Sequence, residues 1–101
     1  MSEALDIVDE VSDEVMPSDN VCDLVEYMVA SLVDNPDAII IDVTDSDESS
    51  LIEVHVDPED VGKVVGRHGL VIKSIRTLAR ACAARDEINA EVEVVRSEER
   101  R

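Results

Sequence analysis

Aromatic residues are almost absent from this chain. Tyr27 is the one aromatic side chain among 101 residues, and there is no Phe and no Trp. Modules such as the RRM and many OB-folds hold nucleic acid by stacking bases on aromatic rings. The sequence therefore excludes modules of that type. Its 45% hydrophobic content, mostly Val, Ile, Leu and Ala, is still ample for one packed core.

Long apolar runs, a basic leader and paired cysteines are also missing. No run approaches the roughly 18 apolar residues of a membrane span, and no basic residue precedes an apolar stretch near the N-terminus. Cys22 and Cys82 lack C-x-x-C spacing, so we expect reduced cysteines that pack as small apolar residues. These absences predict one cytoplasmic domain without membrane contact.

Lysine and arginine do not occur in the first 60 positions. The formal charge of −16 divides into −19 over residues 1–60, +6 over residues 61–85 and −3 over residues 86–101. We call residues 61–85, which contain no Asp or Glu, the basic island. A positive segment in an otherwise acidic chain favours binding of a polyanion. The six cations of the island are Lys63, Arg67, Lys73, Arg76, Arg80 and Arg85.

Both ends of the chain are predicted to lie outside the folded domain. Residues 1–19 carry seven acids and no base, which is typical of a mobile tail. The alternative is an acidic arm that docks on a partner or on the basic island. Residues 97–101 are expected to form a charged end, which leaves residues 20–96 as the domain.

Hydrophobic periodicity predicts an α+β fold in the order α-β-β-α-α-β, with a three-stranded sheet and helices packed on one face. The first helix is expected over residues 21–34, with Asn20 as N-cap and Asn35-Pro36 as its stop. Alternation of apolar and polar residues predicts strands at residues 37–44, 51–56 and 88–96.

Residues 57–60 are a strong helix start, with Asp57 as N-cap, Pro58 at the first position and acids in the first turn. Gly62 in this short helix costs about 1 kcal/mol relative to Ala, and we expect close backbone approach of another element to offset it. The last helix is predicted over residues 70–85. Its apolar face is expected to consist of Val71, Ile75, Leu78, Ala79 and Cys82.

The tetrapeptide Gly66-Arg67-His68-Gly69 joins these two helices inside the basic island. Glycine there avoids a Cβ that would block a phosphate or demand a strained φ. Backbone N–H groups at the start of the last helix can then donate to phosphate oxygens. Arg67 would add a charge-assisted contact, and neutral His68 one hydrogen bond. The predicted RNA-binding residues are Lys63, Val65, Gly66, Arg67, His68, Gly69 and Lys73.

Two plainer interpretations stand beside this one. The glycines could simply cap two helices joined by a turn, but that leaves the exclusion of acids from 25 consecutive residues unexplained. For Arg76, Arg80 and Arg85, the plainer interpretation is that they are solvated or pair with acids elsewhere in the chain.

Residues 64–72 resemble the signature of the KH domain, in which aliphatic residues precede G-x-x-G and a helix follows. The α-β-β-α-α-β order resembles the type II arrangement of that fold. More narrowly, residues 32–37, 54–69 and 74–78 resemble the small stand-alone bacterial KH proteins of the KhpA family. This resemblance covers residues 20–96.

The resemblance implies an RNA chaperone that binds single-stranded RNA in post-transcriptional regulation. It also implies a homodimer, a larger KH partner of the KhpB (Jag) type, and a link to cell-wall synthesis and cell shape. The chain departs from this pattern in its acidity and in having one permanent cation, Arg67, in the loop. The alternative function is a dimerisation or scaffold protein of KH fold, with the apolar side of the last helix as its seam.

Enzymatic motifs are not visible. Gly62-Lys63 lacks the spacing and the hydroxyl of a P-loop, and no nucleophile–base pair is apparent. His55 and His68, taken with Asp57 and Glu59, have no metal-ligand spacing. We therefore expect no catalytic residue, no metal site and no cofactor.

Overall fold

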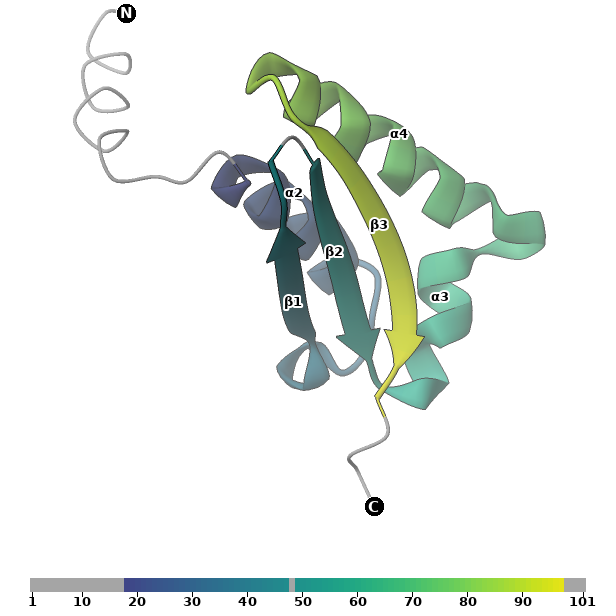
Figure 1. Ribbon diagram of the computed structural model, residues 1–101. Helices are drawn as coiled ribbons and strands as arrows, with labels where there is room; N and C mark the ends of the chain where they lie inside the picture. Colours follow the sequence, from purple (N-terminus) through teal and green to yellow (C-terminus); the bar gives the residue numbers. More distant parts are fainter. Residues whose placement is uncertain (1–17, 48, 98–101) are drawn as a thin grey trace, which may run out of the picture.

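The computed structural model describes residues 18–47 and 49–97 (Figure 1). The predicted acidic tail lies outside this part except for Ser18 and Asp19, and the predicted charged end is described only at Ser97. The order α-β-β-α-α-β is confirmed. The elements are α2 (Asp19–Ala30), a 3₁₀ turn (Pro36–Ala38), β1 (Ile40–Asp45), β2 (Ser49–Val56), a 3₁₀ turn (Pro58–Asp60), α3 (Val61–Val65), a 3₁₀ turn (Arg67–Gly69), α4 (Leu70–Arg85) and β3 (Asn89–Arg96).

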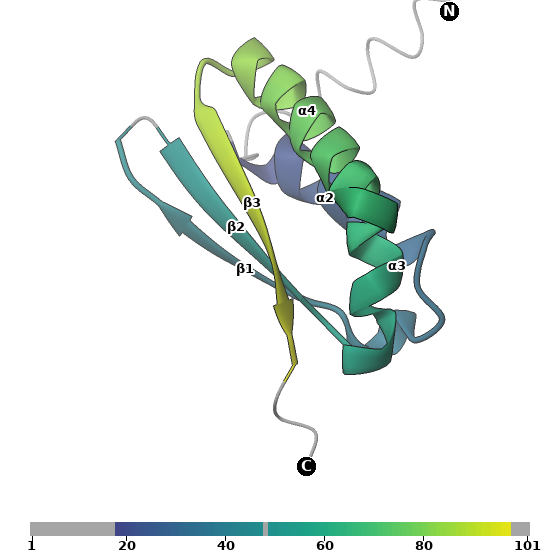
Figure 2. The ribbon, with the colours of Figure 1, turned by 90° about the vertical axis from the view of Figure 1, so that its right-hand side faces the viewer.

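The domain has two layers, a twisted sheet and the helices α2, α3 and α4 on one of its faces (Figure 2). The strand order is β1-β2-β3, in which β2 pairs antiparallel with β1 and parallel with β3. A parallel pair needs a crossover connection, and α3 and α4 supply it. We call the sheet face turned away from the helices the open face.

The core lies between the two layers. Ile52, Val54 and Val56 of β2 are buried, whereas the residues between them face the other way and are half-buried. Val21, Val25 and Val29 meet them from α2, at the spacing of one helix face. Each fully buried aliphatic side chain of this size contributes about 1.5–3 kcal/mol. The core is completed by Val64, Ile72, Ile75, Ala79, Ala83, Ala90 and Val92.

The first helix begins earlier and ends earlier than predicted. Ser18, not Asn20, occupies its N-cap position, and Asn20 instead donates from Nδ2 to Asp86 beyond the end of α4 (3.3 Å). Beyond Ala30 the amides of Ser31, Leu32 and Val33 still donate to the carbonyls of Tyr27 and Val29, in a turn that closes the helix. Asp34 and Asn35 donate their N–H groups to the carboxylate of Asp60 rather than to carbonyls one turn back.

The first strand is also shorter than predicted, since it begins at Ile40. Pro36 stands at the first position of a 3₁₀ turn over Pro36–Ala38, and that turn occupies the residues expected to open the strand. The other two strands lie close to their predicted places. Ser97 extends the pairing of β3 by donating its N–H to the carbonyl of Val56 (2.8 Å).

The last helix spans Leu70–Arg85 as predicted, but its buried face differs from the predicted one. The buried residues are Ile72, Ile75, Ala79 and Ala83, while Leu78 is 51% exposed. Ala79 and Ala83 are small, so they let α4 approach the sheet closely. A helical wheel that counts apolar residues ignores the size of their side chains, and it therefore did not favour these two positions over Leu78. None of the described helices is long and apolar enough to span a membrane.

Candidate nucleic-acid interface

The approach to the G-x-x-G loop is fixed by two aspartates. Asp57 caps the turn before α3, as predicted, because its side chain accepts a hydrogen bond from the N–H of Glu59 (2.9 Å). Asp60, three residues later, is fully buried. From the sequence, Asp60 was expected only to complement the dipole of the helix that it precedes. In the structure, Asp60 also binds a distant segment of the chain.

The Asp60 carboxylate holds the connection between α2 and β1. Oδ1 accepts from the N–H of Asp34 (3.2 Å), and Oδ2 accepts from the N–H and Nδ2 of Asn35 (3.0 and 3.1 Å). Burial acts to raise the pKa of Asp60, but these hydrogen bonds and the nearby Lys63 outweigh it, so the pKa lies below its usual 3.8. Asp60 thus anchors the start of α3, and with it the loop.

Three of the four loop residues have positive φ. Gly66 has φ 80°, and a Cβ there would lie 2.9 Å from the backbone nitrogen of Val71. Gly69 has φ 73° but open space around it, so its backbone conformation rather than its surroundings requires glycine. His68, with φ 56° and ψ 23°, is one of the few residue types enriched in the left-handed region. The loop is a tight, specified turn.

The amides of the loop divide into two groups. Those of Gly69 and Leu70 donate to the carbonyls of Gly66 and Arg67, so they stabilise the loop itself. The following amides open the 16-residue helix α4, whose N-cap, Gly69, makes no side-chain hydrogen bond. The first N–H groups of a helix lack intrahelical acceptors, and together with the helix dipole they favour an anion.

The cations of the basic island are almost all uncompensated. Lys63 is the exception, since its Nζ lies 3.3 Å from Asp34 Oδ2 and 3.8 Å from Asp60 Oδ1. Within the part of the chain that the structure describes, the other five make no ion pair, so the expectation that Arg76, Arg80 and Arg85 pair with acids finds no support there. Arg76 instead donates from Nε to the carbonyl of Val92 on β3 (3.0 Å).

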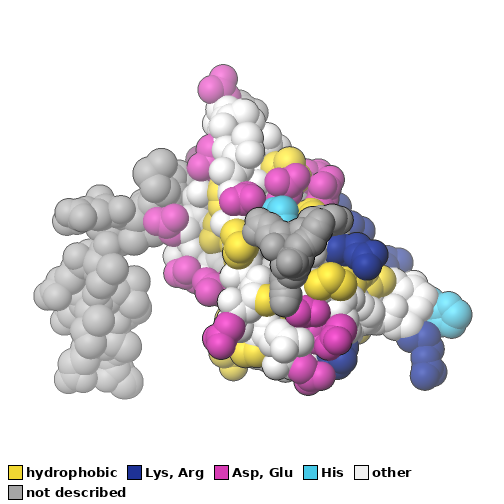
Figure 3. Space-filling model, turned by 90° about the horizontal axis from the view of Figure 1, so that it is seen from below, with side chains coloured by type: hydrophobic (Ala, Val, Ile, Leu, Met, Phe, Trp, Pro, Cys, Tyr) yellow, Lys and Arg dark blue, Asp and Glu magenta, His cyan; other side chains and the backbone are white. Residues whose placement is uncertain are grey.

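These side chains form a positive region over α3, the loop and α4. Arg67, His68 and Lys73 are exposed. In Figure 3, Lys and Arg gather toward the side where α3 and α4 lie, and Asp and Glu cover much of the rest of that view. Among the aliphatic residues beside the loop, Val64 is fully buried in the core, whereas Val65 is only partly buried.

Surface hollows also occur outside the loop in the described part of the chain, and two of them are large enough to consider. One, of about 580 Å³, is lined by the connection between α2 and β1 and includes Asp34, Asp37 and Asp57. Its carboxylates give it the wrong charge for a polyanion. The other, of about 420 Å³, lies between the end of α4 and β3 and includes Arg80 and Glu91. The chemistry of the loop, rather than either hollow, therefore defines the candidate site.

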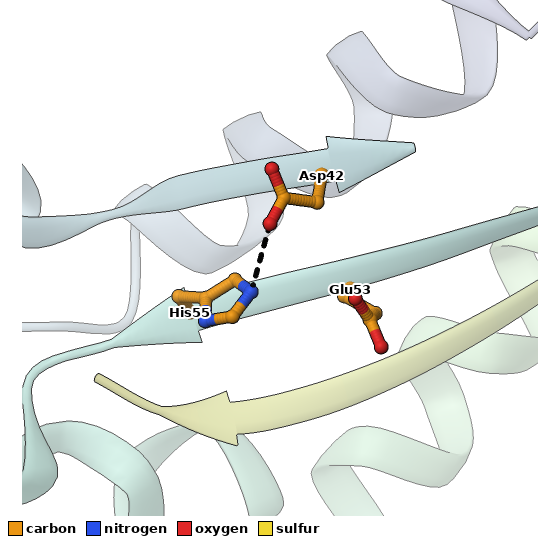
Figure 4. Close-up of side chains that lie close together, drawn as sticks. All are labelled: Asp42, Glu53 and His55. Atoms are coloured by element: carbon orange, nitrogen blue, oxygen red, sulfur yellow. Dashed lines mark ion pairs between the residues drawn. The ribbon is translucent and has the colours of Figure 1, made fainter. Parts of the chain in front are cut away.

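The two histidines lie in different surroundings. His68 is exposed in the loop, and His55 lies on the open face of the sheet, with Nε2 3.1 Å from Oδ2 of Asp42 (Figure 4). The sequence grouped His55 with Asp57 and Glu59, but the register of β1 and β2 places it beside Asp42 and Glu53. The sequence alone shows that Glu53 and His55 lie on one face of the strand, because they are two residues apart. That Asp42 lies beside them depends on the register between β1 and β2, which the sequence does not give.

Comparisons with known proteins agree with this geometry. The family model of the KhpA/KhpB KH domain matches residues 22–94. RNA-binding protein KhpA of Borreliella burgdorferi is 38% identical over 76 residues, which cover 75% of this chain and 93% of that protein. RNA-binding protein KhpA of Caldanaerobacter subterraneus subsp. tengcongensis is 40% identical over 73 residues, covering 72% and 97%. The Mycobacterium tuberculosis protein of the same name is 43% identical over 65 residues, covering 64% and 81%.

A solved structure shares the fold. Era from Aquifex aeolicus aligns with a TM-score of 0.59 and 19% identity. The alignment covers 78% of this chain but only 31% of that chain. At this level of identity the likeness concerns the fold alone.

Proposed function

Because the chain belongs to the KhpA/KhpB family of KH domains, we propose that it binds single-stranded RNA through the G-x-x-G loop and the basic island. One observation carries this proposal. Five cations, in the glycine-bracketed loop and along the helix that follows it, have no carboxylate partner among the described residues, in a chain of formal charge −16. Such a region attracts a phosphate backbone and lacks an internal acid to compete with it.

The KH groove accommodates about four unpaired nucleotides, with the loop against their backbone. Arg67 donates to a phosphate, the first amides of α4 donate to the same anion, and His68 adds a hydrogen bond. Lys73 extends the positive field along α4, and Val65 offers an apolar surface to a base. Lys63 contributes less than a free lysine, because Asp34 and Asp60 already neutralise it.

Binding of one domain is expected to be weak and sensitive to salt. With about three phosphate contacts, the slope of log affinity against log salt is about −2 for a single strand. Affinity then falls roughly 20-fold between 50 and 200 mM salt. A second groove, in a dimer or a KH partner, raises avidity without new contacts.

The finer role that we propose is that of a cytoplasmic RNA chaperone in post-transcriptional regulation. It would act as a homodimer and with a KhpB (Jag)-type KH protein, in processes connected with cell-wall synthesis and cell shape. Exposed apolar side chains on the helical layer support the pairing: Tyr27 is 73% exposed on α2, and Leu70 and Leu78 are 58% and 51% exposed on α4. The same residues favour the second candidate, a scaffold whose main ligand is another protein.

The double substitution Arg67→Asp with His68→Asp separates the two candidates. Asp tolerates the left-handed conformation of residue 68, so the fold should survive. We expect short single-stranded RNA to bind at least about tenfold more weakly, because a cation is replaced by repulsion at the phosphate. The matched control is Asn89→Asp with Arg96→Asp, which places two aspartates on exposed positions of β3, outside the basic island.

The two candidate functions predict different results for the loop variant in cells. RNA crosslinking that persists in the loop variant at normal protein levels would show that the loop is not the RNA site. If crosslinking is lost but the variant strain does not reproduce the phenotype of a strain without the protein, the scaffold function is favoured.

A further inference from the structure

The open face of the sheet carries a row of carboxylates. Asp42 of β1 lies directly opposite Glu53 of β2, and Glu53 lies directly opposite Glu93 of β3. Three acids thus occupy neighbouring positions across all three strands. Like charges placed directly opposite one another destabilise a sheet. The row is therefore a local cost that a bound cation would offset.

No lysine or arginine offsets it within the described strands. The outward-facing positions that accompany the row along β1, β2 and β3 hold no basic residue other than His55. None of these carboxylates has an ion pair with Lys or Arg in the part of the chain described. The cations of the basic island lie on α3, on α4 and in the loop between them, on the other side of the sheet.

His55 brings a nitrogen ligand to this row. Its Nε2 is 3.1 Å from Asp42 Oδ2, but the contact lacks the geometry of a hydrogen bond. Nε2 is buried and has no hydrogen-bond partner among the described residues, although 25% of the His55 side chain is exposed. A buried ring nitrogen without a partner is costly, and a metal ion bound there would remove that cost.

The three side chains have ligand atoms close enough to share one ion. One atom each from Asp42, Glu53 and His55 lie within 4.8 Å of one another (Figure 4). A tetrahedral site with bonds of about 2.0–2.2 Å needs ligands roughly 3.3–3.6 Å apart. Small side-chain rotations cover that difference, because Asp42 is exposed and Glu53 is only partly buried.

We propose that Asp42, Glu53 and His55 bind a divalent transition-metal ion, with Zn²⁺ as the ion that the ligand set fits best. One imidazole and two carboxylates suit zinc, whereas calcium and magnesium prefer oxygen ligands alone. Three protein ligands leave a fourth position for water or for Glu93. The site lies on the face opposite the helices, so this proposal goes beyond RNA binding and does not depend on it.

Calorimetric titration of the full chain with zinc chloride tests the site. Because cysteines also bind zinc, the parent carries Cys22→Ala and Cys82→Ala. We expect one zinc ion per chain, and at least about tenfold weaker binding when either Glu53→Gln or His55→Gln removes a ligand. Glu91→Gln is the matched control, since it removes the same charge from the same face outside the cluster.

Absence of saturable zinc binding in the parent would overturn the proposal. Equal weakening by Glu91→Gln and Glu53→Gln would also overturn it, because the ion would then be held by diffuse acidity. If a ligand variant fails to fold, the parent alone still gives a decision. Substoichiometric Mn²⁺ should broaden the amide signals of Asp42, Glu53 and His55 before any others, and broadening centred on another segment would refute the assignment.

Discussion

The α3–α4 side of the helical layer and the open face of the sheet carry opposite charges, which few ion pairs compensate among the described residues. On the helical side, five cations of the basic island make no ion pair among the described residues. On the sheet side, Asp42, Glu53 and Glu93 stand in one row without a lysine or arginine partner there. The comparison teaches that the net charge of a small domain does not decide its ligand, because screening over about 8 Å at physiological salt lets each face act separately.

The two faces also differ in how firmly the backbone is specified. The sheet face follows from regular strand alternation, whereas the loop depends on three positive φ values and on the buried Asp60. Substitutions that distort the loop are therefore expected to have larger effects than substitutions that change single surface charges.

Gly66→Ala should have the largest effect. Its Cβ would meet Val71 at a backbone position with φ 80°, so we expect a loss of about 2 kcal/mol in the free energy of unfolding, together with loss of RNA binding. Urea denaturation and an RNA titration measure the two effects. Gly62→Ala is the matched control, because nothing lies within 4 Å of its added Cβ. Equal effects of the two substitutions would contradict the role given to Gly66.

Asp60→Asn should lower the Tm and make it less sensitive to acid. The pKa of Asp60 is lower in the folded state than its usual 3.8, so its stabilisation is present above that value and is lost as the pH falls through the folded pKa. The difference in Tm between the parent and Asp60→Asn should therefore shrink below about pH 4. Thermal melts between pH 7 and pH 3 measure it, with the exposed Glu59→Gln as control. A difference that stays constant over this range would count against the buried carboxylate as its source.

Asp34→Asn should strengthen RNA binding by about two- to threefold at low salt. The substitution frees Lys63 from an exposed ion pair of 3.3 Å, and such pairs are worth about 0.2–1 kcal/mol. Asp37→Asn removes the same charge nearby without touching Lys63. If both variants gain equally, the cause is general repulsion and not release of the lysine.

Gly62→Ala should have a small effect of opposite sign. Gly62 was expected to allow close approach of another element, and that expectation is wrong, since the position is open. Alanine should therefore stabilise the helix by about 1 kcal/mol, measured as a higher urea midpoint with an unchanged slope. A destabilised variant would reveal a constraint on this glycine that the described part of the chain does not contain.

Much of the fold could be predicted from the sequence because its strongest signals are local. The glycines and the uninterrupted run of helix-forming residues placed the last helix at Leu70–Arg85, and Asp57 capped the turn as expected. The segment after α2 could not be predicted, because Asp60, 25 residues beyond Asn35, accepts the amides of Asp34 and Asn35, which the predicted helix and its stop had included. Leu78 was placed in the core because a wheel does not show which side of a helix meets the sheet.

The candidate site also has a part that the sequence predicts and a part that it does not. The loop glycines, Arg67 and the absence of acids are sequence features, so they could be recognised without coordinates. The pairing of Lys63 with Asp34, the bond from Arg76 to β3 and the position of His55 beside Asp42 depend on contacts between distant segments. No local pattern encodes such contacts.

The most direct test of the helical face as the RNA site is an NMR titration with short single-stranded RNA in low-salt buffer. The largest chemical-shift changes should centre on the amides of residues 66–69 and extend along α4 past Lys73, while the row of acids on the sheet stays unmoved. Shifts confined to the sheet face, or a loop whose signals do not move, would contradict the account.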